Sequence, residues 1–134
     1  MVVLDVNAAA GLCRDSEGTD GFLARFGDEK TISPKYFRVE AAQVAWKYVH
    51  AGIDDKKLAK PFMECMFNYV DEFVDDGDLL VEALSEAVKL DHSFYDMLYL
   101  VLARRTASPL VTCDKRLASL CRESGVECVE LMDL

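Results

Sequence analysis

Several features that would assign a class at once are missing from this sequence. No two of its five cysteines form a C-x-x-C pair, which argues against a zinc ribbon, and five widely spaced thiols favour a reducing compartment. The longest apolar run, Met97 to Ala103, is far shorter than a membrane span. The first residues carry neither the basic region nor the cleavage site of a signal peptide. We therefore expect a cytoplasmic protein without a membrane segment.

Basic residues are also in short supply. Lys and Arg number 15 against 24 Asp and Glu, so the formal net charge is −9. This balance argues against a protein held on nucleic acid mainly by a broad basic surface, although it permits a nucleic-acid enzyme with a local basic rim. Hydrophobic residues make up 51% of the chain, which excludes general disorder. At about 150 residues per domain, we expect residues 1–134 to form a single domain.

Short β-branched segments alternate with helical patterns along the chain, which predicts an α/β fold with a parallel sheet covered on both faces. We expect residues 14–30 to form a loop with a short helix around 22–26, and Ser33 and Pro34 to begin the next helix as N-cap and first residue. Ser93 is expected to cap a later, buried helix. The predicted strands are Val2–Leu4, Thr31–Ile32, Phe73–Val74, Pro109–Cys113 and Val126–Leu131, and the main helices are 35–50, 55–70, 79–90, 94–105 and 114–123.

Two acidic residues directly follow predicted strands. Asp5 comes after Val2–Leu4, and Asp114 comes after Pro109–Cys113. Because crossovers between parallel strands share one hand, the two carboxylates should lie at the same C-terminal edge of the sheet, where ligands bind in such folds. The simpler interpretation of each is a helix N-cap, a position at which Asp is preferred.

Two more acids lie on apolar helix faces. Glu40 shares a face with Phe37 and Val44, and Asp96 lies in a strongly apolar helix. An ionised carboxylate on a core-facing surface is costly unless it is paired or bound to a metal. The simpler interpretation is a buried ion pair, for example with Arg38 or Arg104.

All four acids can converge on one edge of one sheet. Carboxylates gathered in one pocket raise one another's pKa, and a hard divalent cation relieves that conflict. An all-oxygen donor set favours Mg²⁺ or Mn²⁺ over Zn²⁺, and such sites usually serve phosphate chemistry. The pattern therefore predicts a divalent-metal site for phosphate chemistry, with Asp5, Glu40, Asp96 and Asp114 as its candidate ligands.

At this point the sequence resembles a known family. Four segments are similar, in order and spacing, to the PIN-domain family. They are the opening Val3-Leu4-Asp5-Val6-Asn7, Pro34 followed by Glu40-Ala41-Ala42, the segment Tyr95-Asp96-Met97-Leu98-Tyr99-Leu100-Val101-Leu102-Ala103, and Leu110-Val111-Thr112-Cys113-Asp114-Lys115-Arg116-Leu117. Within this family they resemble the VapC-like toxin ribonuclease of a type II toxin–antitoxin (VapBC) system. The departures are Val6, where many members carry Thr or Ala, and Met97, where Ala is usual.

The resemblance implies a three-layer α/β/α fold and a Mg²⁺- or Mn²⁺-dependent endoribonuclease whose acidic quartet is Asp5, Glu40, Asp96 and Asp114. It implies that Asn7 orients a carboxylate or water, and that Thr112, two residues before Asp114, contacts the acids without being a metal ligand itself. It also implies an RNA substrate, a cognate antitoxin protein as partner and a homodimer. The −9 charge is more acidic than expected for an RNA enzyme.

Several other residues have open roles. Lys115 and Arg116 follow Asp114 and could contact RNA phosphate, although a functionless basic first turn is an equal alternative. His92 is expected to be a loop or capping residue rather than a base, and Cys113 a small strand hydrophobe. The five acids between 71 and 78 suggest a solvated turn.

Two other functions remain open from the sequence. A catalytically silent PIN-like module that binds a protein partner would suit the acidic surface. A phosphohydrolase that uses Asp5 as nucleophile is weakened because Asn7 stands where its second acid would be.

Overall fold

The centre of the protein is a five-stranded parallel sheet with the strand order β3-β2-β1-β4-β5. The computed structural model describes all 134 residues, apart from the side chains of residues 16 and 17. The strands are β1 (Val2–Leu4), β2 (Thr31–Pro34), β3 (Glu72–Val74), β4 (Leu110–Thr112) and β5 (Cys128–Glu130). The chain adds strands on one side of β1 and then crosses to the other side, so the order reverses between β1 and β4.

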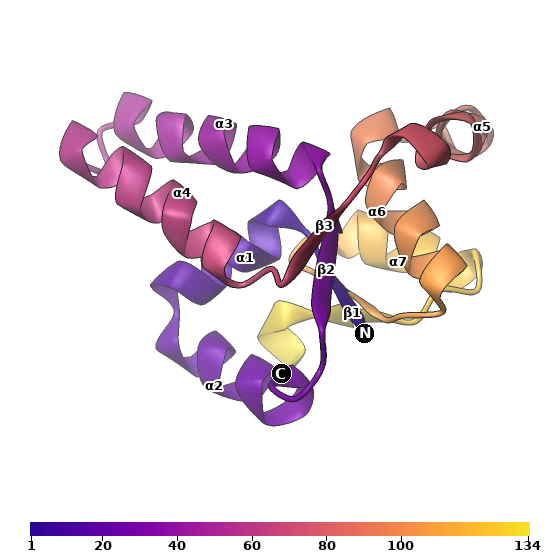
Figure 1. Cartoon of the computed structure of the whole chain (residues 1–134), viewed down its shortest axis with the longest axis horizontal. Helices are drawn as coiled ribbons and strands as arrows, with labels where there is room; N and C mark the ends of the chain where they lie inside the picture. The colour runs from indigo at the N-terminus through magenta and orange to yellow at the C-terminus, as the bar shows by residue number, and fades with distance from the viewer.

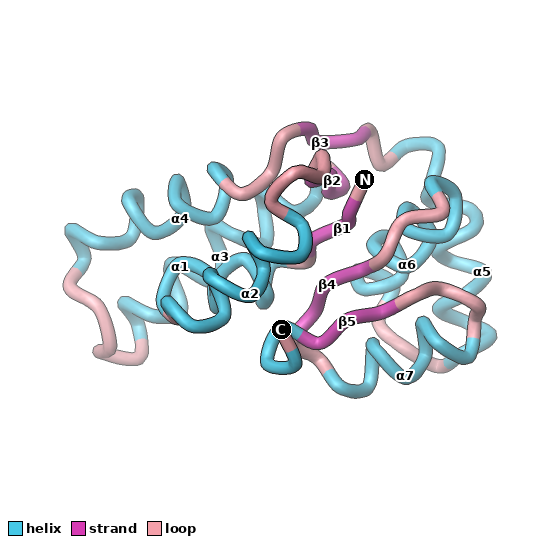
Figure 2. Tube along the Cα trace, turned by 90° about the horizontal axis from the view of Figure 1, so that it is seen from below, coloured by secondary structure: helices cyan, strands magenta, loops and turns pink.

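Helices cover both faces of the sheet, which gives the three-layer α/β/α arrangement expected from the sequence. Figure 1 shows the first four helices on one side of the strands and the last three on the other, and Figure 2 shows the same division from below. The first group is α1 (Val6–Arg14), α2 (Ser16–Phe26), α3 (Tyr36–His50) and α4 (Ala59–Asn68). The second group is α5 (Leu80–Leu90), α6 (Phe94–Thr106) and α7 (Lys115–Glu123).

The core follows from the two most apolar segments of the sequence. Every residue of β1 is fully buried, and seven consecutive residues of α6, Met97 to Ala103, are buried as well. A helix that is apolar all round can be stable only when it is surrounded. Helix α6 contacts β1, β2 and β4 and also packs against α5, so it forms the inner helix of its layer.

The expected elements are largely confirmed, with three corrections. Ser33 and Pro34 do not begin a helix, because they belong to β2, and α3 starts at Tyr36. The region expected to be mostly loop before β2 contains the end of α1 and all of α2. Ser93 precedes α6 as expected, but its side chain makes no capping hydrogen bond.

Five free thiols were expected, and this is wrong. Cys13 and Cys65 form a disulfide between α1 and α4, with Cα atoms 6.2 Å apart. Cys113, Cys121 and Cys128 are free. Disulfides are rare in reducing compartments, so the cysteines no longer support the expected localisation. Among the described residues, no helix has the length and apolar character needed to cross a membrane.

Candidate active site

The candidate site begins where the strand order reverses, between the C-terminal ends of β1 and β4. Asp5 follows β1, and its Oδ1 accepts a hydrogen bond from the Ala8 amide at 2.8 Å, which caps α1. Its Oδ2 accepts the Thr112 hydroxyl hydrogen bond, and the same hydroxyl oxygen accepts a bond from the Asp114 amide at 3.0 Å. Thr112 therefore joins the two strand-end acids, and the open edge of a parallel sheet at such a reversal is where ligands bind.

Asp114 also has two local roles. Its Oδ1 accepts hydrogen bonds from the amides of Arg116 and Leu117, at 2.9 and 3.1 Å, and so caps α7. The helix-cap interpretation is thus correct for both strand-end acids. It does not compete with the functional one, since each carboxylate is a cap and also lies at the sheet edge.

Glu40 reaches the same region from α3. Its side chain is half-buried, and its Oε1 accepts a hydrogen bond from the Tyr99 hydroxyl at 2.7 Å. Tyr99 belongs to the buried face of α6 and is 1% exposed, so its hydroxyl has a fixed position. Sequence reasoning gave Tyr99 no role, because within an apolar segment its only distinguishing feature is a hydroxyl that needs a partner when buried.

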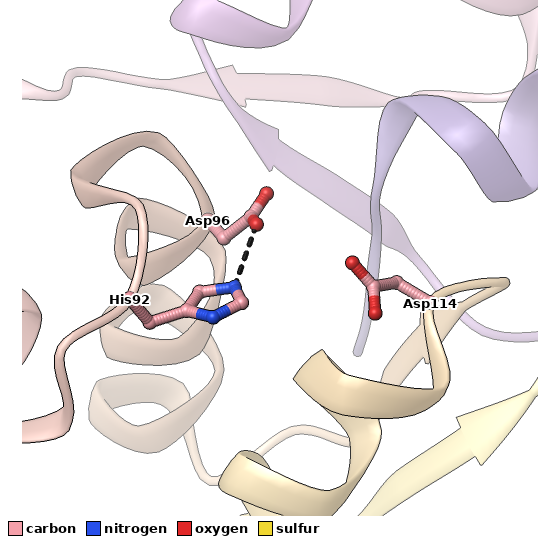
Figure 3. A group of neighbouring side chains, drawn as sticks. All are labelled: His92, Asp96 and Asp114. Atoms are coloured by element: carbon pink, nitrogen blue, oxygen red, sulfur yellow. Dashed lines mark hydrogen bonds and ion pairs between the residues drawn. The ribbon is translucent and has the colours of Figure 1, made fainter.

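Asp96 lies in the first turn of α6 and faces His92. His92 Nε2 is 2.8 Å from Asp96 Oδ2, and single ligand atoms of His92, Asp96 and Asp114 all lie within 4.8 Å of one another. Figure 3 shows the three side chains directed toward a common space. The expectation that His92 is only a loop or capping residue misses this contact, although its i, i+4 spacing from Asp96 was the available signal.

The pKa values link the four acids electrostatically. Burial raises the pKa of Asp5 to about 7, and the charges of Asp96 and Glu40 add to the shift. Burial likewise raises the pKa of Glu40 to about 7, opposed by the Tyr99 hydrogen bond and increased by Asp96. The pKa of Asp96 is raised by burial, opposed by His92 and increased by Asp114. Asp5, Glu40 and Asp96 are therefore each affected by the charge of at least one other acid of the set.

The ion pairs considered for Glu40 and Asp96 do not form among the described side chains. Arg104 instead bonds Glu82 and Glu86, at 2.7 and 2.9 Å, and ties α5 to α6. Arg38 lies over the ring of Phe73, with its guanidinium carbon 5.5 Å from the ring centroid.

A cleft of about 440 Å³ opens beside Glu40 and is lined by Asn7, Tyr36, Val39, Glu40, Gln43, Val44 and Lys47. At its border, the rings of Tyr36 and Tyr95 stack with centroids 4.7 Å apart, and Tyr95 is half exposed. Asn7 is exposed in the first turn of α1, and no hydrogen bond joins its side chain to a carboxylate among the described residues.

The residues after β4, Cys113 to Arg116, lie at the same edge of the sheet as Asp5. Lys115 and Arg116 are exposed, and Arg116 donates a 3.3 Å hydrogen bond to the Asp91 carbonyl. Cys113 is exposed and lies just beyond the end of β4, not inside the strand as expected. Burial and the charges of Asp5 and Glu130 raise its pKa to about 11, so the thiolate is disfavoured and a nucleophilic role is not supported.

Comparison with known proteins gives one family and several similar folds. A family model described as PIN domain matches residues 2–123. No curated protein matches. Among solved structures, PAE2754 from Pyrobaculum aerophilum is 22% identical with a TM-score of 0.77, over 98% of this chain and 84% of that one.

Two further structures match at lower identity. VapBC2 from Rickettsia felis, bound to a DNA fragment from its promoter, is 13% identical with a TM-score of 0.69, over 97% of this chain and 98% of that one. FitAB bound to an IR36 DNA fragment is 14% identical with a TM-score of 0.69, over 100% and 97% of the two chains. At these identities the likeness establishes the fold alone.

Proposed function

This chain belongs to the PIN domain family, and from that premise we propose that it is a Mg²⁺- or Mn²⁺-dependent endoribonuclease that hydrolyses RNA phosphodiesters. The observation that carries the proposal is the convergence of Asp5, Glu40, Asp96 and Asp114 at the reversal of the sheet, with raised pKa values in three of them. Buried acids arranged in this way are costly while the site is empty, and a ligand of opposite charge would offset that cost.

The donor set suits a hard divalent cation. The carboxylates of Asp5, Asp96, Asp114 and Glu40 supply oxygen ligands, and their mutual repulsion would be relieved by positive charge between them. When bound, such an ion polarises a phosphodiester and lowers the pKa of water. We assign the ligands to Asp5, Asp96 and to Asp114 or Glu40, and the orientation of the attacking water to the remaining carboxylate.

The chain's own residues prepare these acids. Thr112 fixes one oxygen of Asp5, and Tyr99 fixes one oxygen of Glu40. Held by Tyr99, Glu40 is suited to accept a proton from the attacking water. The alternative in which Asp5 attacks phosphorus directly is disfavoured because Asn7 stands where the second acid of such an enzyme would be.

The RNA would lie along the cleft beside Glu40. We propose that Asn7, Gln43 and Lys47 contact a nucleotide there and that the stacked pair Tyr36 and Tyr95 supports an unpaired base. Lys115 and Arg116 would contact phosphate at the opposite rim. A few local cations are sufficient for this task, so the net charge of −9 does not oppose it.

We further propose that the chain is the toxin of a toxin–antitoxin pair and binds a cognate antitoxin protein. The support is the fold shared with VapBC2 and FitAB, each of which was solved bound to DNA. A homodimer is proposed through α5, where Val81, Leu84 and Val88 form an apolar stripe with exposures of 84%, 57% and 76%. All of these properties are assigned to one domain, residues 1–134.

RNA cleavage by purified protein tests the nuclease. We expect single-stranded RNA to be cut with Mg²⁺ or Mn²⁺, cleavage to stop with chelator, and Glu40→Gln to slow it by about 100-fold or more. Asp28→Asn, an exposed acid remote in sequence from the site, is the matched control purified in the same way. If Glu40→Gln and wild type cut equally, the activity is a contaminant and the proposal fails. Absence of cleavage together with tight binding of a neighbouring gene's product would favour the silent binding module.

A further inference from the structure

The imidazole of His92 lies beside Asp96, one of the four acidic residues of the candidate site. Its side chain is 9% exposed, and its Nε2 lies 2.8 Å from Asp96 Oδ2. In Figure 3 the ring lies between the start of α6 and the start of α7, on the side of Asp96 that faces Asp114. The chain has two histidines, and the other, His50, is at the end of α3 with its ring stacked on Trp46.

The turn that carries His92 is fixed from both sides. Asp91 ends α5 in the left-handed conformation, with φ of 49°, and the His92 amide donates to the Ala87 carbonyl at 3.2 Å. Arg116, from the first turn of α7, donates to the Asp91 carbonyl at 3.3 Å. The backbone of the turn is therefore held by α5 and α7, and the ring is held by Asp96 of α6. A donor held in this way loses little entropy when it binds a ligand.

The spacing of the three donors fits one ion. Adjacent ligands of an octahedral cation with bonds of about 2.1 Å lie roughly 3 Å apart, and opposite ligands about 4.2 Å apart. The 2.8 Å separation of His92 and Asp96 matches adjacent ligands, and the 4.8 Å limit for the set requires only a small closure toward Asp114. Imidazole nitrogen suits transition-metal ions, whereas Mg²⁺ prefers oxygen.

We propose that His92 is a direct nitrogen ligand of the divalent cation held by Asp96 and Asp114, and that it shifts the preference of the site from Mg²⁺ toward Mn²⁺ or Co²⁺. This inference rests on the proposed metal site and adds to it a ligand that differs in chemistry from the four acids. A consequence is that Mn²⁺ binds more tightly than it would to the carboxylates alone.

Spectroscopy of bound Mn²⁺ tests the contact without any substitution. In pulsed electron paramagnetic resonance, Mn²⁺ bound to the whole protein should show coupling to a ligand nitrogen, and the coupling should change when histidine is labelled with ¹⁵N. The coupling should disappear in His92→Leu and persist in His50→Leu, the matched control. Bound Mn²⁺ without nitrogen coupling would overturn the proposal and leave His92 as a hydrogen-bond partner of Asp96.

Calorimetry with Mn²⁺ and Mg²⁺ tests the preference. We expect His92→Leu to weaken Mn²⁺ binding by about 10- to 100-fold, and Mg²⁺ binding much less. His92→Gln, which retains a polar side chain, serves if His92→Leu does not fold, and equal loss of both metals would overturn the proposal. RNA cleavage without nitrogen coupling would refute His92 as a metal ligand and would still support the nuclease. Nitrogen coupling without RNA cleavage would support His92 as a ligand and would refute the nuclease.

Discussion

At the scale of single residues, the site is built from side chains that each perform a structural and a chemical task. Asp5 caps α1 through one oxygen and receives Thr112 on the other. Sequence reasoning could treat the cap and the site only as alternatives, because it cannot tell that the two oxygens have separate partners. The partner of Asp5 lies 107 residues away, and no local pattern marks it.

The double role of Asp5 predicts opposite effects on stability and activity. Asp5→Asn removes a desolvated charge but keeps an oxygen for the Ala8 amide, so the metal-free protein should be at least as stable as wild type at pH 8. RNA cleavage should fall by about 100-fold or more, because a ligand is lost. Asp55→Asn is the matched control, since Asp55 also caps a helical turn but is exposed, and neither quantity should change. Loss of stability in Asp5→Asn would contradict the argument.

The raised pKa values predict how stability depends on pH. Asp5 and Glu40 have folded-state pKa values of about 7, above their ordinary values of 3.8 and 4.5. Between about pH 5 and 7 the folded state therefore holds protons that the unfolded chain has released, so stability falls as pH rises through this range. Denaturant unfolding of the metal-free protein should give a lower midpoint at pH 8 than at pH 5.5. Mn²⁺ should raise the midpoint more at pH 8, because protons no longer compete for the acids.

At the scale of elements, the sequence predicted what depends on local periodicity and failed where the partner was distant. The buried helix α6 and the strand β1 follow from their apolar residues, and both were expected. The start of α3 was expected two residues too early, at Pro34 instead of Tyr36. Its first amide, at Tyr36, is capped by Asp76 at 2.8 Å, and Ser33 instead donates to the Leu4 carbonyl in the neighbouring strand. Both interactions cross the fold, which explains why a local helix signal was misleading.

The acids between 71 and 78 illustrate the same limit. The strand expected at Phe73–Val74 is confirmed as β3, whereas the acids around it were expected only to form a solvated turn. Asp71 accepts the Thr31 amide, and Asp76 supports α3. A charge run looks solvated in sequence, but the strand ends beside it need acceptors for their free amides.

The disulfide between α1 and α4 makes a testable contribution to stability. It closes 52 residues, and removing such a link typically costs about 2–4 kcal/mol through the entropy of the unfolded chain. Cys65→Ala should lower the free energy of unfolding by about this amount, whereas Cys113→Ala, a free and exposed thiol, should not. Unfolding of oxidised wild type, with the bridge verified by mass spectrometry, provides the reference. Equal stability of reduced and oxidised protein would contradict the prediction.

Helix α5 provides a second element-scale prediction, on assembly. Asp78 lies just before its apolar stripe and Lys89 near its end, so two copies packed antiparallel bring opposite charges together. Leu84→Glu should convert the proposed dimer to monomer in analytical ultracentrifugation, because it would place like charges at the two-fold axis. Leu23→Glu, an exposed leucine on α2, is the matched control and should leave the mass unchanged. A wild-type protein that is monomeric at high concentration would refute the dimer.

At the scale of the whole molecule, the net charge of −9 opposes the negatively charged substrate proposed for it. The proposed function therefore requires local recognition, by Lys47 in the cleft and by the exposed Lys115 and Arg116. An enzyme of this kind gains little from long-range attraction, so its affinity should come from few phosphate contacts, from stacking and from the cation.

Local recognition by a few cations predicts that the affinity for RNA depends only weakly on salt concentration. With two or three phosphate contacts, the logarithm of the RNA association constant should fall against the logarithm of salt concentration with a slope of about −1.4 to −2. The Glu40→Gln variant with Mg²⁺ allows binding to be measured by fluorescence anisotropy while cleavage is slow. Adding Arg116→Gln should reduce the slope by about 0.7, whereas Lys57→Gln, outside the proposed path, should not alter it. A slope much steeper than −3 would mean that a broad basic surface binds RNA, and it would contradict local recognition.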